Sequence, residues 1–276
     1  MIKIKIGNKT MSNKAYAEGS ALLLDVFHRI HLRDLPIHKL SIVLRRIMRR
    51  LILIDSKLEL IFEIASLDAG KFAIFIKQLR KEILEIILRS NYNKLKLLLI
   101  HLAYICPKCF VYFILEFKEP LSRRLLQKHF NDIILLVIEI ARVREDLGII
   151  FVREYLYVLR ELSRGEGITH LGTVVWHINR LGYKRLAWQI FDGLIGIFIE
   201  HTKDPAKVAW LLLTLNKIDA DFLKWAINKL RSSLINIINE APKERRKAFI
   251  SIIRRDNSVF QQISFIIGDC LSYLSV

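Results

Sequence analysis

Helix-breaking and crosslinking residues are scarce in this chain of 276 residues, which holds 11 glycines, 5 prolines and 3 cysteines. Glycine and proline form most tight turns, so their scarcity disfavours a fold built from many short strands. Three cysteines, a small and odd number, argue against a disulfide scaffold and fit a reducing, intracellular setting. The basic N-terminus is not followed by an apolar segment with a small-residue cleavage site, so we predict a cytoplasmic protein without a signal peptide.

The motifs of common catalytic and cofactor sites are also missing. The sequence contains no nucleophile elbow, no HExxH, no P-loop and no GxGxxG, and its glycines are scattered singly. The sequence therefore indicates neither an enzyme nor a cofactor.

Acidic residues are in deficit: 27 aspartates and glutamates face 44 lysines and arginines, for a formal charge of +17. This excess favours an acidic partner such as nucleic acid or an anionic membrane. The alternative is the charged exterior of a thermophile protein, which needs no such partner. With 53% hydrophobic residues, the chain has enough apolar side chains for a substantial core.

One apolar run, LLLIHLAYICPKCFVYFILEF at 97–117, has the length of a membrane span. It contains His101, Pro107, Lys108 and Glu116, with the lysine near its middle. A charge at the bilayer centre is costly, so we expect no integral membrane insertion. A peripheral membrane protein that uses a basic face stays open.

What the chain does contain is an internal repeat. EIASLDAGKFAIFI at 63–76 aligns without a gap on HLAYICPKCFVYFI at 101–114. Ala65 then matches Ala103, and Phe72 matches Phe110. Further copies follow at 139–152, 177–190 and 214–227, with weaker ones at 254–267 and 21–36.

A period of roughly 37–38 residues that holds two amphipathic helices is typical of a helical-hairpin solenoid. We predict an all-α fold, a right-handed-type α-solenoid of about six to seven hairpins, forming one domain over 1–276. Within it we distinguish an extension at 1–12, a divergent hairpin with a basic helix at 13–55, and repeats over 56–276. The arrangement resembles HEAT and TPR α-solenoids in architecture alone, because the tetratricopeptide unit is shorter and its Trp, Gly, Tyr and Pro pattern is absent.

The repeat also predicts where helices end. The first helix of each hairpin should end near one of five residues and the second should begin about four residues later. The five are Leu67, Ile105, Val143, Leu181 and Ile218. Glu119-Pro120 should kink or interrupt one second helix, because proline is costly inside a helix.

Cys106-Pro107-Lys108-Cys109 falls in one of these turns. Structural zinc needs four ligands, and the chain has no second CxxC pair, so we predict no metal site from this chain alone. A thioredoxin-like role would place the motif in a βαβ context, which is missing. We therefore interpret the motif as a structural turn, with zinc shared across a dimer, or redox chemistry, as the open alternatives.

Two basic clusters are candidates for binding phosphate. In the first, four arginines share one face of a helix without an interleaved acid, which suits phosphate recognition. These are Arg45, Arg46, Arg49 and Arg50. The second cluster, within 242–256, contains Lys243, Arg245, Arg246, Lys247, Arg254 and Arg255. Solvated faces are the alternative for both.

Corresponding turns of a solenoid align along one edge, so their basic residues should form a ladder. Its members would be Lys71, Lys108, Arg144, Lys184 with Arg185, and Arg254 with Arg255. Such a ladder would follow a nucleic-acid backbone by shape and charge. Trp176, Trp188, Trp210 and Trp225 have helical spacings typical of a core, so base stacking is disfavoured and structured RNA is preferred over an unpaired strand.

We therefore expect a non-enzymatic, basic α-solenoid that docks onto structured RNA or a ribonucleoprotein such as the ribosome, with DNA next. The alternatives are a protein-protein adaptor that binds an acidic peptide or helix, and a peripheral protein on anionic lipid. The apolar C-terminus, IIGDCLSYLSV, adds the expectation of a homodimer through the C-terminal hairpin.

Overall fold

The computed structural model describes residues 37–51, 54–166, 170–202 and 204–272. These residues form sixteen helices, and no strand occurs among them. None of the helices in these ranges is both long and apolar enough to cross a bilayer. The predicted extension at 1–12 and the weak repeat copy at 21–36 lie outside the described residues.

The chain forms two compact units, Met1–Phe113 and Ile114–Val276. The first contains α2 (Ile37–Arg50), α3 (Ile54–Leu67), α4 (Ala69–Gln78), α5 (Arg80–Arg89), α6 (Tyr92–Ile105) and the start of α7 (Pro107–Glu116). The second continues with α8 (Lys118–Leu125), α9 (Phe130–Val143), α10 (Glu145–Glu154), α11 (Leu156–Glu166), α12 (Leu171–Arg180), α13 (Lys184–His201), α14 (Pro205–Ile218), α15 (Ala220–Glu240), α16 (Lys243–Ile253) and α17 (Asn257–Ser272).

The predicted helix ends are confirmed. As predicted, α3 ends at Leu67, α6 at Ile105, α9 at Val143 and α14 at Ile218. α12 ends one residue before Leu181. The predicted turn length is wrong in most hairpins, because a single extended residue separates the two helices. Asp68, Cys106, Arg144 and Asp219 have φ of −167, −146, −157 and −170° with ψ of 135, 91, 127 and 134°. One such residue both ends the first helix and begins the second, so no longer loop is needed.

The second helix of three hairpins is interrupted at equivalent positions. Leu79, Phe117 and Tyr155 occupy the same place in successive repeats and share φ near −110° and ψ of 20 to 26°. The interruption near Pro120 is therefore confirmed, but the same break occurs in two helices without proline. Pro120 lies in the first turn of α8, where its missing N–H has no intrahelical partner to lose.

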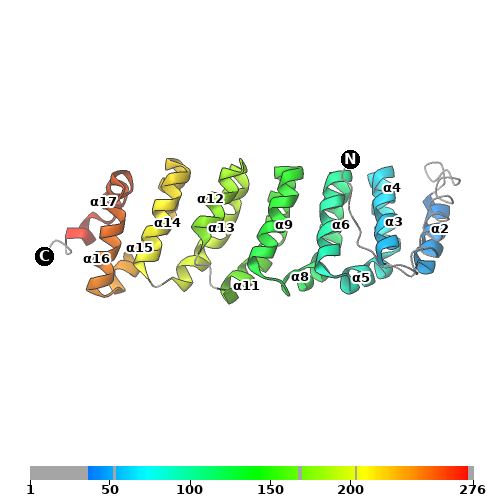
Figure 1. The fold of residues 1–276 in the computed structure, drawn as a ribbon, viewed down its shortest axis with the longest axis horizontal. Helices are drawn as coiled ribbons and strands as arrows, with labels where there is room; N and C mark the ends of the chain where they lie inside the picture. The colour runs from blue at the N-terminus through cyan, green and yellow to red at the C-terminus, as the bar shows by residue number, and fades with distance from the viewer. Residues whose placement is uncertain (1–36, 52–53, 167–169, 203, 273–276) are drawn as a thin grey trace, which may run out of the picture. The chain divides into compact units, whose positions relative to one another are not determined.

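Neighbouring hairpins pack on one another within each unit. In the first unit, α3 contacts α4 and α6, and α2 contacts α4. In the second, α14 contacts its hairpin partner α15 and lies between α12 and α16 (Figure 1). Aligned apolar residues form the core: Phe72, Phe110 and Ala103 are fully buried. Burying each phenylalanine contributes about 2 to 3 kcal/mol, so the repeated register is also the register of the core.

Candidate functional site

The predicted basic helix that carries the four arginines is present as α2, which ends at Arg50. Leu44 and Met48 are buried, whereas Arg45, Arg46 and Arg49 are exposed. Arg50 is the last residue of the helix. The amphipathic pattern therefore directs at least three of the four arginines away from the core.

Arg45 and Arg49 line a pocket together with residues of the neighbouring hairpin. The guanidinium of Arg45 donates to the carbonyl of Gln78 at 3.1 Å, and Arg49 Nε pairs with Glu82 Oε1 at 3.3 Å. The pocket has a volume of about 420 Å³. Its lining residues are Arg45, Arg49, Lys77, Gln78, Arg80, Lys81, Glu82 and Leu84.

This α2 pocket is strongly cationic. Five of the eight described lining residues are lysine or arginine, one is acidic and none is aromatic. The arginines hold their positions through bonds to α4 and α5, so a bound anion would meet pre-oriented guanidinium groups. The lining suits a phosphate better than a stacked base, since none of its described residues offers an aromatic ring.

The second predicted cluster lies on α16 and at its C-terminal end. Lys243, Arg245 and Lys247 are exposed, whereas Arg246 is half-buried. Within the described part of the chain, Arg246 Nε is buried without a hydrogen-bond partner. The cluster is thus divided between solvent and the helix packing.

Arg254 and Arg255 lie over aromatic rings. Arg254 is 5.5 Å from the ring centre of Phe260, and Arg255 is 5.4 Å from that of Trp210 on α14. Trp210 is 48% exposed, unlike the core residue that its spacing predicted. These contacts are cation–π interactions, which give both arginines a role in packing as well as charge.

The turns of neighbouring hairpins contact one another in the second unit. The backbone N–H of Leu186 donates to Glu145 Oε1 at 3.2 Å, Lys184 pairs with Asp219, and Asn216 donates to Asp256 at 2.8 Å. These bonds place the turns of successive hairpins side by side in that unit.

Two predicted ladder members, Arg144 and Lys184, are paired with acids. Arg144 pairs with Asp146 at 2.7 Å, and Lys184 pairs with Asp219. The hydrogen bond from Lys184 lowers the pKa of Asp219, and in return it raises the pKa of Lys184. Lys108 and Arg185 are exposed and Lys71 is half-buried. A continuous ladder along the whole chain stays a prediction.

Cys106 and Cys109 form a disulfide at the start of α7. The sequence had instead suggested cysteines kept as thiols. The described residues contain no cluster of three or more His, Cys, Asp or Glu side chains able to hold a metal ion. Zinc held by these two cysteines would therefore need ligands from outside the described part of the chain.

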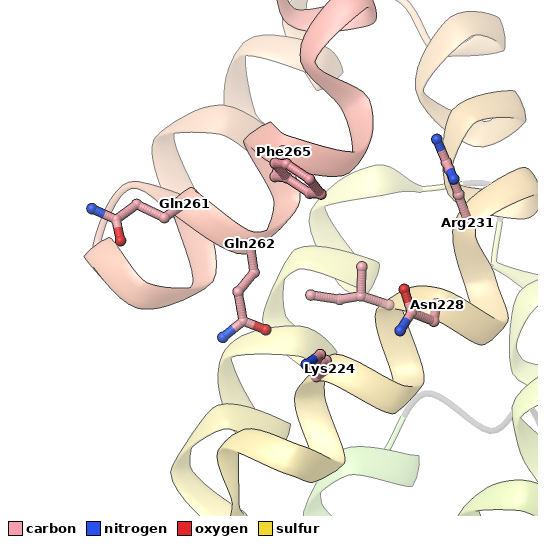
Figure 2. A pocket seen from close by; sticks show the side chains of 7 residues that line it. Lys224, Asn228, Arg231, Gln261, Gln262 and Phe265 are labelled. Atoms are coloured by element: carbon pink, nitrogen blue, oxygen red, sulfur yellow. The ribbon is translucent and has the colours of Figure 1, made fainter.

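A second pocket, which the sequence did not reveal, lies between α15 and α17 and has a volume of about 540 Å³. Figure 2 shows Gln262 and Phe265 of α17 facing Lys224 and Asn228 of α15. Phe265 is 92% exposed. The only sequence signal was the i, i+4, i+7 spacing of Lys224, Asn228 and Arg231, which resembles any solvated helix face.

Comparison with protein-family models, with curated proteins and with solved structures finds no match to this chain.

Proposed function

We propose that this protein is a non-enzymatic α-solenoid that binds a polyanion through the α2 pocket, with structured RNA or a ribonucleoprotein such as the ribosome as the ligand. The observation that carries the proposal is the concentration of five cationic residues around one solvent-accessible pocket with a single acid. A formal charge of +17 adds long-range attraction for such a ligand.

The solenoid part of the proposal is supported by the range of the contacts between hairpins. Long-range side-chain hydrogen bonds span from 33 residues, as from Arg45 to Gln78, to 41 residues, as from Tyr155 to Ile114. These separations bracket the length of the sequence repeat. Contacts between successive repeats are typical of helical-repeat proteins. The number of hairpins and the hand of the stack belong to the proposal.

The preference for structured RNA follows from the lining of the pocket. Its described residues offer charge-assisted hydrogen bonds and no aromatic ring, which suits the phosphates of a duplex. DNA is the next polyanion. Anionic lipid and an acidic protein segment would meet the same charge, and the experiment separates them. The homodimer through the C-terminal hairpin stays a separate prediction.

The test measures binding of the full chain to a fluorescent RNA duplex across a series of salt concentrations. The site variant carries Arg45→Gln and Arg49→Gln. The matched control carries Arg89→Gln and Arg142→Gln, both exposed and outside the pocket. Each pair lowers the formal charge by two, from +17 to +15.

Wild-type affinity should fall steeply with salt, because binding to phosphates releases counterions. The site variant should bind about tenfold to a hundredfold more weakly and reduce the salt slope by about 2, whereas the control should stay close to wild type. Equal losses in both variants would remove the α2 pocket as the site. Tighter binding to anionic vesicles or to an acidic peptide than to the RNA duplex would assign the charge to those partners.

A further inference from the structure

The disulfide between Cys106 and Cys109 joins a half-buried residue to a fully buried one. Cys106 is half-buried at the turn, whereas Cys109 is 1% exposed inside α7. We propose that this pair is a reversible thiol–disulfide exchange site that reacts with thiols reaching it from solvent.

The fold does not require the disulfide. The corresponding turns at Asp68 and Asp219 adopt the same extended backbone and close with carboxylate caps. Asp68 accepts from the N–H of Lys71 at 2.9 Å, and Asp219 accepts from that of Asp221 at 2.8 Å. Because the cysteines are only three residues apart, their bond also closes a very short loop, which stabilises a fold least.

The same backbone also accommodates the reduced cysteines. The N–H of Cys109 points at Cys106 Sγ, 3.2 Å away, so a thiolate at Cys106 would keep a hydrogen-bond donor at the start of α7. Cys109 Sγ lies 3.8 Å from the carbonyl oxygen of Ala65, which would accept from its S–H group. Both redox states therefore have partners without a rearrangement of the helices.

The exchange follows from the difference in accessibility. An external thiolate attacks Cys106 Sγ, the sulfur–sulfur bond breaks, and Cys109 leaves as a thiolate that takes a proton. A second external thiol then attacks the sulfur that the first one contributed, which releases Cys106. Two external thiols become one disulfide while the two cysteines are reduced, and the reverse reaction re-forms their bond. Lys108 is exposed between the cysteines, where its charge favours an approaching thiolate.

The test uses the full chain with Cys270→Ser, so that only Cys106 and Cys109 respond. The protein is equilibrated in glutathione buffers of increasing oxidising strength, trapped with an alkylating agent and weighed by mass spectrometry. We expect one reversible transition between the doubly alkylated and the disulfide form, with constant helicity. Three results would overturn the proposal. The disulfide could survive the most reducing buffer, the thiols could survive the most oxidising one, or the protein could lose helicity on reduction.

Single variants test the two roles. In the same background, Cys109→Ser should form a mixed disulfide with glutathione at Cys106, whereas Cys106→Ser should not, because Cys109 is buried. Equal modification of both variants, or of neither, would contradict the assignment. Exchange rates with glutathione and with an unstructured cysteine-containing peptide identify which source of thiol is preferred, and exchange with neither would also overturn the proposal.

Discussion

Replacing Tyr155 by phenylalanine should remove one buried hydrogen bond and one ionisable group at once. Tyr155 is fully buried, and its hydroxyl donates to the carbonyl of Ile114 at 2.8 Å. Its ring stacks on Phe151 with 4.6 Å between ring centres, a contact that phenylalanine preserves. The substitution therefore removes the hydrogen bond and leaves a carbonyl unpaired in the last turn of α7. This should lower the free energy of unfolding by about 1 to 2 kcal/mol at neutral pH.

The same substitution should change the response to alkali. Burial raises the pKa of Tyr155 well above its ordinary value of about 10. Above about pH 10 the unfolded chain loses this proton while the folded protein keeps it, so stability falls by about 1.4 kcal/mol per pH unit from this residue alone. The variant has no tyrosine here to ionise, so its stability does not fall for this reason. The difference in free energy of unfolding between wild type and variant at pH 8 should therefore shrink above pH 10 and disappear at about pH 11.

Urea unfolding followed by circular dichroism at pH 8, 10 and 11 measures the free energy of unfolding of the wild type and of Tyr155→Phe. Tyr157→Phe is the matched control: Tyr157 is 44% exposed, so this change should alter stability by less than about 0.5 kcal/mol at pH 8. A constant difference between wild type and Tyr155→Phe from pH 8 to 11 would refute the reasoning about ionisation. No difference at pH 8 would refute the buried hydrogen bond.

Two further predictions concern the second unit. A Cβ at Gly193 would overlap Leu156, so Gly193→Ala should cost about 1 to 3 kcal/mol. An added Cβ at Gly196 in the same helix meets no described atom within 4 Å, so Gly196→Ala should stabilise the protein by about 0.5 to 1 kcal/mol. Thermal melts in which both variants shift the melting temperature in the same direction would contradict this packing. Lys184→Gln should raise the pKa of Asp219 towards its ordinary value, because the hydrogen bond that lowers it is lost. The variant should then lose less stability than the wild type as the pH falls below about 4. An NMR titration of Asp219 that is the same in both proteins would show that the bond does not form.

The positions of helix ends could be predicted because they follow the apolar register. The single-residue turns could not be predicted as reliably. Asp68 and Asp219 are residues typical of helix N-caps, but Cys106 and Arg144 adopt the same backbone without such a signal. The breaks show the same limit: Pro120 indicated one of them, whereas nothing in the residue type marks Leu79.

The candidate site was predicted in part. The arginines of α2 were visible because they share one helix face without an acid. Lys77, Arg80 and Lys81 were not assigned, because they meet α2 only through its packing on α4, far along the sequence. The ion pair between Lys184 and Asp219 was missed for the same reason, since local spacing does not show which turns lie side by side.

The equivalent breaks at Leu79, Phe117 and Tyr155 divide the part of the chain between them into segments of one repeat each. Because the backbone has the same conformation at each break although the side chains differ, a segment running from one break to just before the next begins and ends in matching geometry. The segment 117–154 is one such cassette, and its length is that of one sequence repeat. The breaks, rather than the turns, are therefore the natural junctions at which to shorten or lengthen the protein by design.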